Sequence, residues 1–312
     1  MRRPPNLPRR AGKPADIDLA DIQGNVLRGY TMPAAAYLFL RIVDVDKARA
    51  LMARMLPQVV TAAPWSDGAP ATAMNVAFTF AGLQALRLPD GLLASFPAAF
   101  RDGMAARAEQ LGDRGPSAPA GWEKGLGTGD AHVLVTVYAV DAEHLRAALA
   151  NVLDSDSEHA VELVHLQRAE ALMGGRDHFG FFDGIAQPAL QGSGVAPRPG
   201  DGQPDGHGGW REVATGEVLL GYRDEDGTLP AAPGPPFEKN GTYVVYRKLA
   251  MDVAAFRRYV AEQRALPGRR PPAGGQDRRP LARRHTPGRL ARPPRREALL
   301  RLSADQRLRL HR

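Results

Sequence analysis

The sequence contains no cysteine in its 312 residues. A chain without thiols forms no disulfide framework, has no thiol nucleophile and offers no thiolate to a metal ion. Any metal or cofactor must therefore be held by histidine, carboxylate, tyrosine or backbone groups.

Long hydrophobic runs are also missing. No apolar segment approaches the roughly 20 residues that a membrane-spanning helix needs, so the sequence excludes an integral membrane protein. The N-terminus contains four arginines: Arg2, Arg3, Arg9 and Arg10. They are not followed by the apolar segment that a secretory signal needs. We therefore expect a soluble, cytoplasmic protein.

Lysine is absent from residues 264–312, which hold 15 arginines, seven prolines and three acidic residues. This segment has a net charge of +12 against +7 for the whole chain, which leaves −5 for residues 1–263. Only leucine and alanine supply apolar surface, too little to offset the entropy of ordering the segment. We predict a disordered tail. An arginine-rich arm for nucleic acid is a less favoured alternative, since such arms usually mix lysine with arginine.

Hydrophobic periodicity in the first half of the chain alternates between strand and helix patterns. The expected strands are residues 37–43, 75–80, 132–139 and 161–166. One helix is expected over residues 96–111, ending at Gly112. Two more are expected to begin at Asp46 and after Asp141, with these residues on their buried faces: Leu51, Met52, Met55 and Leu56 in the first, and Leu145, Leu149 and Val152 in the second.

This order of elements predicts an α+β protein built on ferredoxin-like domains, in which an antiparallel four-stranded sheet carries helices on one face. A second unit of this kind begins later, with expected strands at 217–222 and 242–246, a turn at 224–227 and a helix at 251–263. The expected organisation is an N-terminal segment (1–30), a first ferredoxin-like domain (31–168), an incomplete second one (169–263) and the tail (264–312).

The most informative stretch is residues 180–188, GFFDGIAQP. It places Asp183 between phenylalanines and a glycine, where backbone can approach a flat ligand closely. Apolar surroundings raise the pKa of a carboxyl group and make it a candidate proton carrier. The alternative is an ordinary Asp-Gly turn between strands.

This stretch resembles the G-x-x-D-G motif of the dye-decolorising peroxidases, which are haem enzymes with two ferredoxin-like domains. Residues 22–30 (IQGNVLRGY) resemble the opening segment of that family. Residues 75–83 and 100–113 are similar to its first-domain patterns, and residues 241–256 to its second domain. The resemblance covers roughly residues 21–263, and the neighbouring segments make the short motif specific.

The resemblance implies that Asp183 lies on the peroxide side of haem b and moves a proton between the two oxygens of hydrogen peroxide. It also implies that Phe182, Gly184, Ile185 and Gln187 line the haem, because they lie beside Asp183. Dyes, phenols and other small aromatic reductants are the expected second substrates. A homo-oligomer is left open.

The family holds its iron through a histidine and stabilises peroxide with an arginine, both from the C-terminal half of the second domain. We expect both to be missing here, since they would lie beyond Arg264. The remaining histidines are expected to be structural or incidental rather than iron ligands: His132, His144, His165, His178, His285 and His311. We therefore expect weak haem binding and little peroxidase activity. A non-catalytic fragment or binding module on the same fold is the alternative.

The composition of residues 264–312 is typical of a GC-rich message read out of frame. A shift of one base permits Asn-Asp-Phe-Asp-Tyr at the codons from Gln306 onwards, which resembles a family segment a short way before the iron-binding histidine. We expect nucleotide sequencing around the codon of Arg264 to show a change of frame, with a histidine codon further along in another frame. An intact frame through this codon would contradict the hypothesis.

Overall fold

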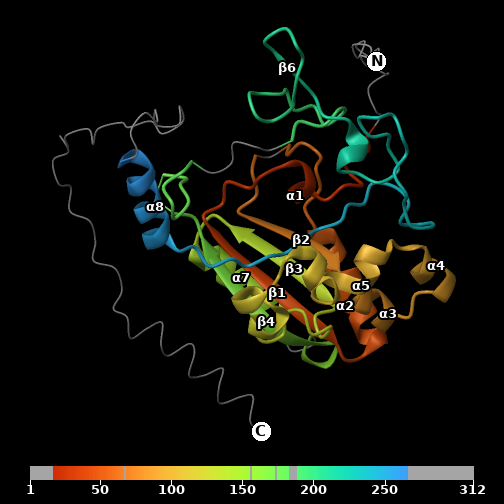
Figure 1. The fold of residues 1–312 in the computed structure, drawn as a ribbon. Helices are drawn as coiled ribbons and strands as arrows, with labels where there is room; N and C mark the ends of the chain where they lie inside the picture. The colour runs from red at the N-terminus through yellow and green to blue at the C-terminus, as the bar shows by residue number, and fades with distance from the viewer. Residues whose placement is uncertain (1–16, 67, 155–156, 173, 183–187, 266–312) are drawn as a thin grey trace. The chain divides into compact units, whose positions relative to one another are not determined.

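A four-stranded antiparallel sheet organises the first half of the chain in the computed structural model (Figure 1). Its spatial order is β2-β3-β1-β4, and the strands are β1 (Ala34–Ile42), β2 (Thr72–Phe78), β3 (Val133–Ala139) and β4 (Val161–Glu170). Helices connect β1 to β2 and β3 to β4, which is the β-α-β-β-α-β arrangement of a ferredoxin-like fold. The predicted fold class is confirmed.

The structure describes residues 17–66, 68–154, 157–172, 174–182 and 188–265. Most of the predicted tail, from residue 266 onwards, lies outside the described residues. Residues up to Val253 belong to one unit and the following residues to another, so helix α8 (Val253–Ala265) is considered by itself. None of the described helices is long and apolar enough to cross a membrane.

Two helices carry the core of the first domain, and each begins at an aspartate. The Asp44 carboxylate accepts the Lys47 N–H ahead of α2 (Val45–Met55), so this helix starts slightly earlier than the predicted Asp46. The Asp141 carboxylate accepts two backbone N–H groups at the start of α7 (Ala142–Val152), as predicted. Such caps satisfy N–H groups that have no partner inside the helix.

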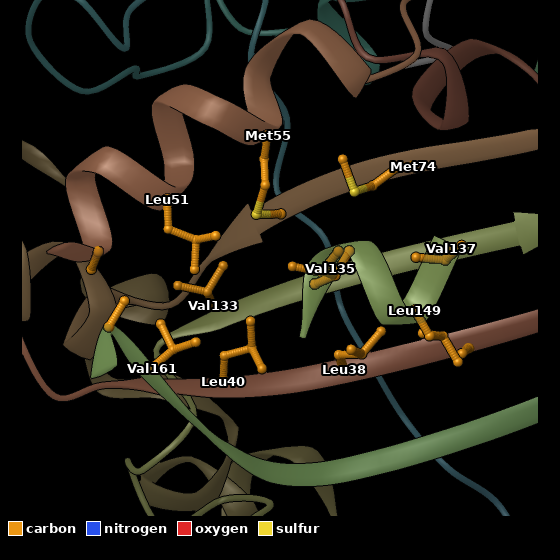
Figure 2. Packing of buried hydrophobic residues seen from close by; sticks show 14 of the residues in the cluster. Leu38, Leu40, Leu51, Met55, Met74, Val133, Val135, Val137, Leu149 and Val161 are labelled. Atoms are coloured by element: carbon orange, nitrogen blue, oxygen red, sulfur yellow. The ribbon is translucent and has the colours of Figure 1, made fainter. Parts of the chain in front are cut away.

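The main hydrophobic core lies between these helices and one face of the sheet (Figure 2). Alternate residues of the strands point into it, because successive side chains of a strand face opposite sides. Its largest members include Leu38, Leu40, Leu51, Met55, Val133, Val135, Val137, Leu145, Leu149 and Val152. Burying each of the larger side chains contributes about 1.5–3 kcal/mol.

One predicted core residue is wrong. Leu56 is 69% exposed, because α2 ends at Met55 and Leu56 already belongs to the 3-10 turn η1 (Leu56–Gln58), which contains Pro57. The tighter winding of a 3-10 turn rotates this side chain away from the buried stripe.

Several short helices, rather than one long one, connect β2 to β3. They are α3 (Phe80–Ala85), α4 (Asp90–Ser95), α5 (Ala98–Ala106), α6 (Ala108–Leu111) and the 3-10 turns η2 (Gly115–Ser117) and η3 (Pro119–Gly121). The single helix predicted over 96–111 is therefore wrong: Pro97 precedes the first helical turn, and Gly103 has a non-helical φ of 72°. The predicted end at Gly112 is confirmed, since this residue forms a left-handed cap with φ 78°.

The second half of the chain departs further from prediction. Residues 215–217 form the 3-10 turn η5 (Thr215–Glu217) where a strand was expected to begin, and Leu219 donates its N–H to the Thr215 carbonyl at 2.9 Å. Residues 242–246 pair with no strand among the described residues. Both strand predictions are wrong, because alternation of apolar residues does not itself provide a neighbouring strand.

The remaining elements are small. The turn at 224–227 is confirmed by a hydrogen bond from the Gly227 N–H to the Asp224 carbonyl, and α8 forms where a helix was predicted. The other described elements are α1 (Gly24–Leu27), η4 (Ser157–His159), β5 (Gln203–Pro204) and β6 (Trp210–Arg211).

A side chain of the opening segment caps the edge of the sheet at β2. The Gln23 carboxamide donates to the Val76 carbonyl at 2.7 Å and accepts the Val76 N–H at 2.8 Å, so it replaces a neighbouring strand at this point. The next residue, Gly24, donates its N–H to the Val60 carbonyl, and a Cβ there would lie 2.8 Å from the Thr61 carbonyl oxygen. The opening segment thus protects an exposed strand edge.

We expect Gln23→Ala to lower the free energy of unfolding by about 1–3 kcal/mol, because both main-chain groups of Val76 lose their partner. Urea denaturation of the full chain measures this difference. The matched control is Gln84→Ala on the exposed side of α3, for which we expect a change within about 0.5 kcal/mol. Equal effects of the two substitutions would contradict the capping role.

Candidate active-site segment

A tight turn precedes the predicted catalytic aspartate. The Asp177 carboxylate accepts the Phe181 N–H at 2.8 Å, and the Phe181 carbonyl accepts the Asp177 N–H at 2.8 Å. Gly180 has φ 97°, a conformation that favours glycine, and its carbonyl accepts a 2.7 Å hydrogen bond from the Arg176 guanidinium. Local hydrogen bonds therefore fix the chain on this side of the motif.

The chain after the motif is anchored in a second hydrophobic cluster. Ala189 and Leu190 are fully buried. The Val213 N–H donates to the Ala189 carbonyl at 2.8 Å, and the Gln191 N–H donates to the Val213 carbonyl at 2.9 Å. Leu190 packs with residues from three other parts of the sequence: Ile22 and Leu27, Ala62, and Leu219 and Tyr222.

This second cluster joins two motifs that are far apart in the sequence. Ile22 and Leu27 come from the opening segment, whereas Leu190 lies two residues after the stretch 180–188. Both ends of that stretch are consequently held, by the turn on one side and by burial on the other. A segment that carries reacting groups needs such fixed ends.

The structure describes only one of the five predicted site residues. Asp183, Gly184, Ile185 and Gln187 lie outside the described residues, so their predicted roles stay predictions. Phe182 is described: it forms an antiparallel bridge with Arg176, and its side chain is exposed. The structure therefore shows the approach to the predicted site but brings no two of the predicted residues together.

Two adjacent phenylalanines directly precede Asp183 in the sequence. Phe181 is 54% exposed and Phe182 is 58% exposed, which is unusual for side chains of this size. Exposed aromatic surface beside a glycine-rich backbone can receive a flat apolar ligand. Sequence reasoning missed the part played by Arg176 and Asp177 in holding the turn, although an aspartate shortly before a glycine is a recognisable turn signal.

Two histidines of the first domain, His132 and His165, lie beside other groups of that domain. The His132 Nδ1 atom accepts the Ile42 N–H at 3.0 Å, and burial, followed by the charge of Arg41, lowers the pKa of this histidine. His165 Nε2 lies 3.2 Å from a Glu123 carboxylate oxygen. Among the described residues, no three histidine or acidic side chains are grouped so as to hold a metal ion.

Aromatic side chains gather on the sheet face opposite the main core. The hydroxyls of Tyr37 and Tyr138 are 3.1 Å apart, and the ring of Tyr30 meets that of Tyr138 edge-on with centroids 5.2 Å apart. Tyr246 packs against Tyr37 and Phe39, with centroid separations of 5.8 and 4.8 Å. Both faces of the sheet are therefore covered near its centre.

Residues 242–249, which we call the strap, supply this cover. Besides the Tyr246 contacts, Arg247 pairs with the buried carboxylate of Asp113, and Lys248 pairs with Glu123. The hydrogen bond from Lys248 is the main cause that lowers the pKa of Glu123. The strap is thus attached to the first domain by aromatic contacts and two ion pairs, rather than by strand pairing.

Comparison with known proteins agrees with these features. Residues 21–171 match the family described as the DyP dimeric alpha+beta barrel domain. A dye-decolorizing peroxidase of Mycena epipterygia is 27% identical over 266 residues, which cover 83% of this chain and 47% of that protein. Peroxidase 2 of Mycetinis scorodonius is 29% identical over 256 residues, which cover 80% and 46%.

The solved structure of an ancestral D-type dye-decolorizing peroxidase matches with a TM-score of 0.63 and 26% identity, over 80% of this chain and 53% of that one. The sheet, its helices and these matches define an α+β protein of the ferredoxin-like class. The chain is similar to the dye-decolorising peroxidases in sequence and in fold. It spans about half the length of the curated relatives it matches.

Tyr30 gives the protein a pH-dependent stability. Burial raises its pKa from 10.0 to about 12, so folding favours the neutral phenol. The resulting stabilisation is complete below pH 10 and is lost as the pH rises through 12, because the unfolded chain ionises first. We expect this contribution to be about 1 kcal/mol after allowance for the partial exposure of the group.

We therefore expect Tyr30→Phe to make the alkaline decline in unfolding free energy shallower, as measured by urea denaturation at a series of pH values. Tyr259→Phe, at an exposed tyrosine of α8, is the matched control and is expected to leave the decline as it is. An unchanged slope in Tyr30→Phe would rule out this role.

Proposed function

We propose that this protein acts as a haem-dependent peroxidase that reduces hydrogen peroxide while it oxidises dyes or phenols, with Asp183 as the acid–base residue. The observation that carries the proposal is the second hydrophobic cluster. It packs the opening segment against Leu190, so the opening segment and the chain that follows the motif share one hydrophobic cluster. An accidental Asp-Gly turn would not require this arrangement.

Haem b is the proposed cofactor, and the described residues fit one side of it. Exposed Phe181 and Phe182 offer apolar surface at the start of the motif. In this proposal Phe182, Gly184, Ile185 and Gln187 lie along the peroxide side of the macrocycle. No described histidine is assigned as the axial ligand. His132 and His144 each use Nδ1 for a hydrogen bond within the first domain, and His165 Nε2 lies beside Glu123.

Asp183 would act on peroxide rather than on iron. Its carboxylate takes the proton from one peroxide oxygen and returns it to the other, which leaves as water. When bound, haem supplies the electrons for cleavage of the O–O bond, and the aromatic reductant replaces them. Apolar neighbours favour this role, since desolvation brings the proton affinity of a carboxylate closer to that needed at neutral pH.

The second candidate is a non-catalytic binding module on the same fold. The hydrogen bonds and ion pair of His132, His144 and His165 within the first domain favour it, since haem without an axial ligand is held only by packing and hydrogen bonds. We also propose a cytoplasmic location, in keeping with a chain that has no cysteine for disulfides.

A hemin titration of the full chain, followed by tryptophan fluorescence and visible absorption, tests the cofactor. One series is run with added imidazole to supply an axial nitrogen. We expect weak binding alone and tighter binding with imidazole. A folded chain that binds no hemin in either series would favour the binding module.

We expect Asp183→Asn to lower peroxide-dependent dye oxidation by the chain loaded with hemin and imidazole roughly 10²–10⁴-fold, with hemin binding retained, because the amide cannot carry the proton. Rates are taken relative to hemin alone. Asp102→Asn, at an exposed aspartate of α5, is the control and is expected to be neutral. Unchanged turnover in Asp183→Asn would exclude the acid–base role.

A further inference from the structure

A cavity of about 250 Å³ opens between α7 and the β2 edge of the sheet. None of the described residues that line it comes from the motif segment at 176–191. It lies on the helix-covered side, where α7 and the end of α2 leave part of β2 uncovered. The aromatic face and the strap, on the opposite side of the sheet, do not contribute to it.

The floor and one wall of the cavity are apolar. Met74 and Val137 are paired across β2 and β3 and face the helices, as Figure 2 shows. Ala147 and Ala148 of α7 line the opposite side. Leu145 and Leu149 of the same helix fill the neighbouring core, whereas the short alanine side chains leave the space open.

Polar side chains stand at the two ends of this apolar space. His144 and Asn151 lie seven residues apart on α7, on the same side as the alanines, which separates their backbone positions by roughly 10 Å along the helix. Gln58, from η1, adds a second carboxamide to the lining. The cavity therefore combines an apolar middle with hydrogen-bonding ends.

Asp141 sets the hydrogen-bonding character of His144. The His144 Nδ1 atom lies 2.8 Å from the Asp141 carboxylate, which also accepts the His144 backbone N–H. These hydrogen bonds lower the pKa of Asp141 and keep it ionised. With its Nδ1–H donated to Asp141, neutral His144 offers Nε2 as an acceptor. The nearby negative charge disfavours an anionic ligand.

We propose that this cavity binds a small uncharged phenol that carries a second polar group on the opposite side of its ring. The phenol hydroxyl donates to His144 Nε2, and the second group bonds to the carboxamide of Asn151 or Gln58. The ring lies between Met74 and Ala148, and a thioether makes favourable contacts with aromatic rings. The volume suits a single ring, since pockets for drug-sized ligands start at roughly 300 Å³.

The proposal does not rest on the peroxidase function, because neither haem nor peroxide takes part in this binding. Hydroquinone is the probe, and 1,4-dimethoxybenzene is its matched control, with the same ring but no hydroxyl donor. We expect hydroquinone to bind the full chain about tenfold more tightly than the ether, with NMR amide shifts confined to β2, η1 and α7. Equal affinity, or shifts elsewhere, would overturn the proposal.

Two substitutions locate the site. Ala148→Leu fills the cavity and is expected to weaken hydroquinone binding at least about tenfold, whereas Ala150→Leu, on the exposed side of the same helix, is expected to leave it unchanged. His144→Phe is expected to abolish the preference for hydroquinone over the ether. Retention of affinity in Ala148→Leu, or of the preference in His144→Phe, would contradict the site. Since the two probes are also compared on the unaltered chain, the test does not depend on the folding of a variant.

Discussion

The burial of β1 on both of its faces is the constraint on which the rest of the structure depends. Leu38 and Leu40 point toward α2 and α7 and are fully buried, while Phe39 points the other way and is buried beneath Tyr246. A strand in this position needs hydrogen-bonding partners on both sides, because its polar backbone has no access to water. β3 and β4 provide them along most of its length.

The edges of the sheet then decide how the remaining chain is used. At β2, the carboxamide of Gln23 and the residues around Val60 take the place of a further strand. This contact brings the opening segment to the sheet, and its apolar residues Ile22 and Leu27 in turn form a cluster with Leu190. The position of Leu190, which follows the motif in the sequence, is therefore coupled to the edge of a sheet from which it is distant in sequence.

Small and large residues on one helix have different consequences for function. Leu145 and Leu149 of α7 close the main core, whereas Ala147 and Ala148 leave the cavity that His144 and Asn151 flank. The same helix therefore stabilises the fold with one face and offers a binding site with the adjacent one. The lining residues His144, Ala147 and Asn151 are exposed, so a ligand can reach this hollow from solvent.

The sequence by itself determined the fold class, the four strands of the first sheet, the cap at Asp141 and the resemblance to the dye-decolorising peroxidases, because alternation, capping residues and motifs are local patterns. Tertiary structure decided the features that depend on partners. Residues 242–246 alternate like a strand but lie across aromatic rings without strand pairing, and Leu56 leaves the core because Pro57 changes the winding of the chain. The role of Gln23 was likewise hidden, since a side chain can replace a strand only where folding leaves an open edge beside it.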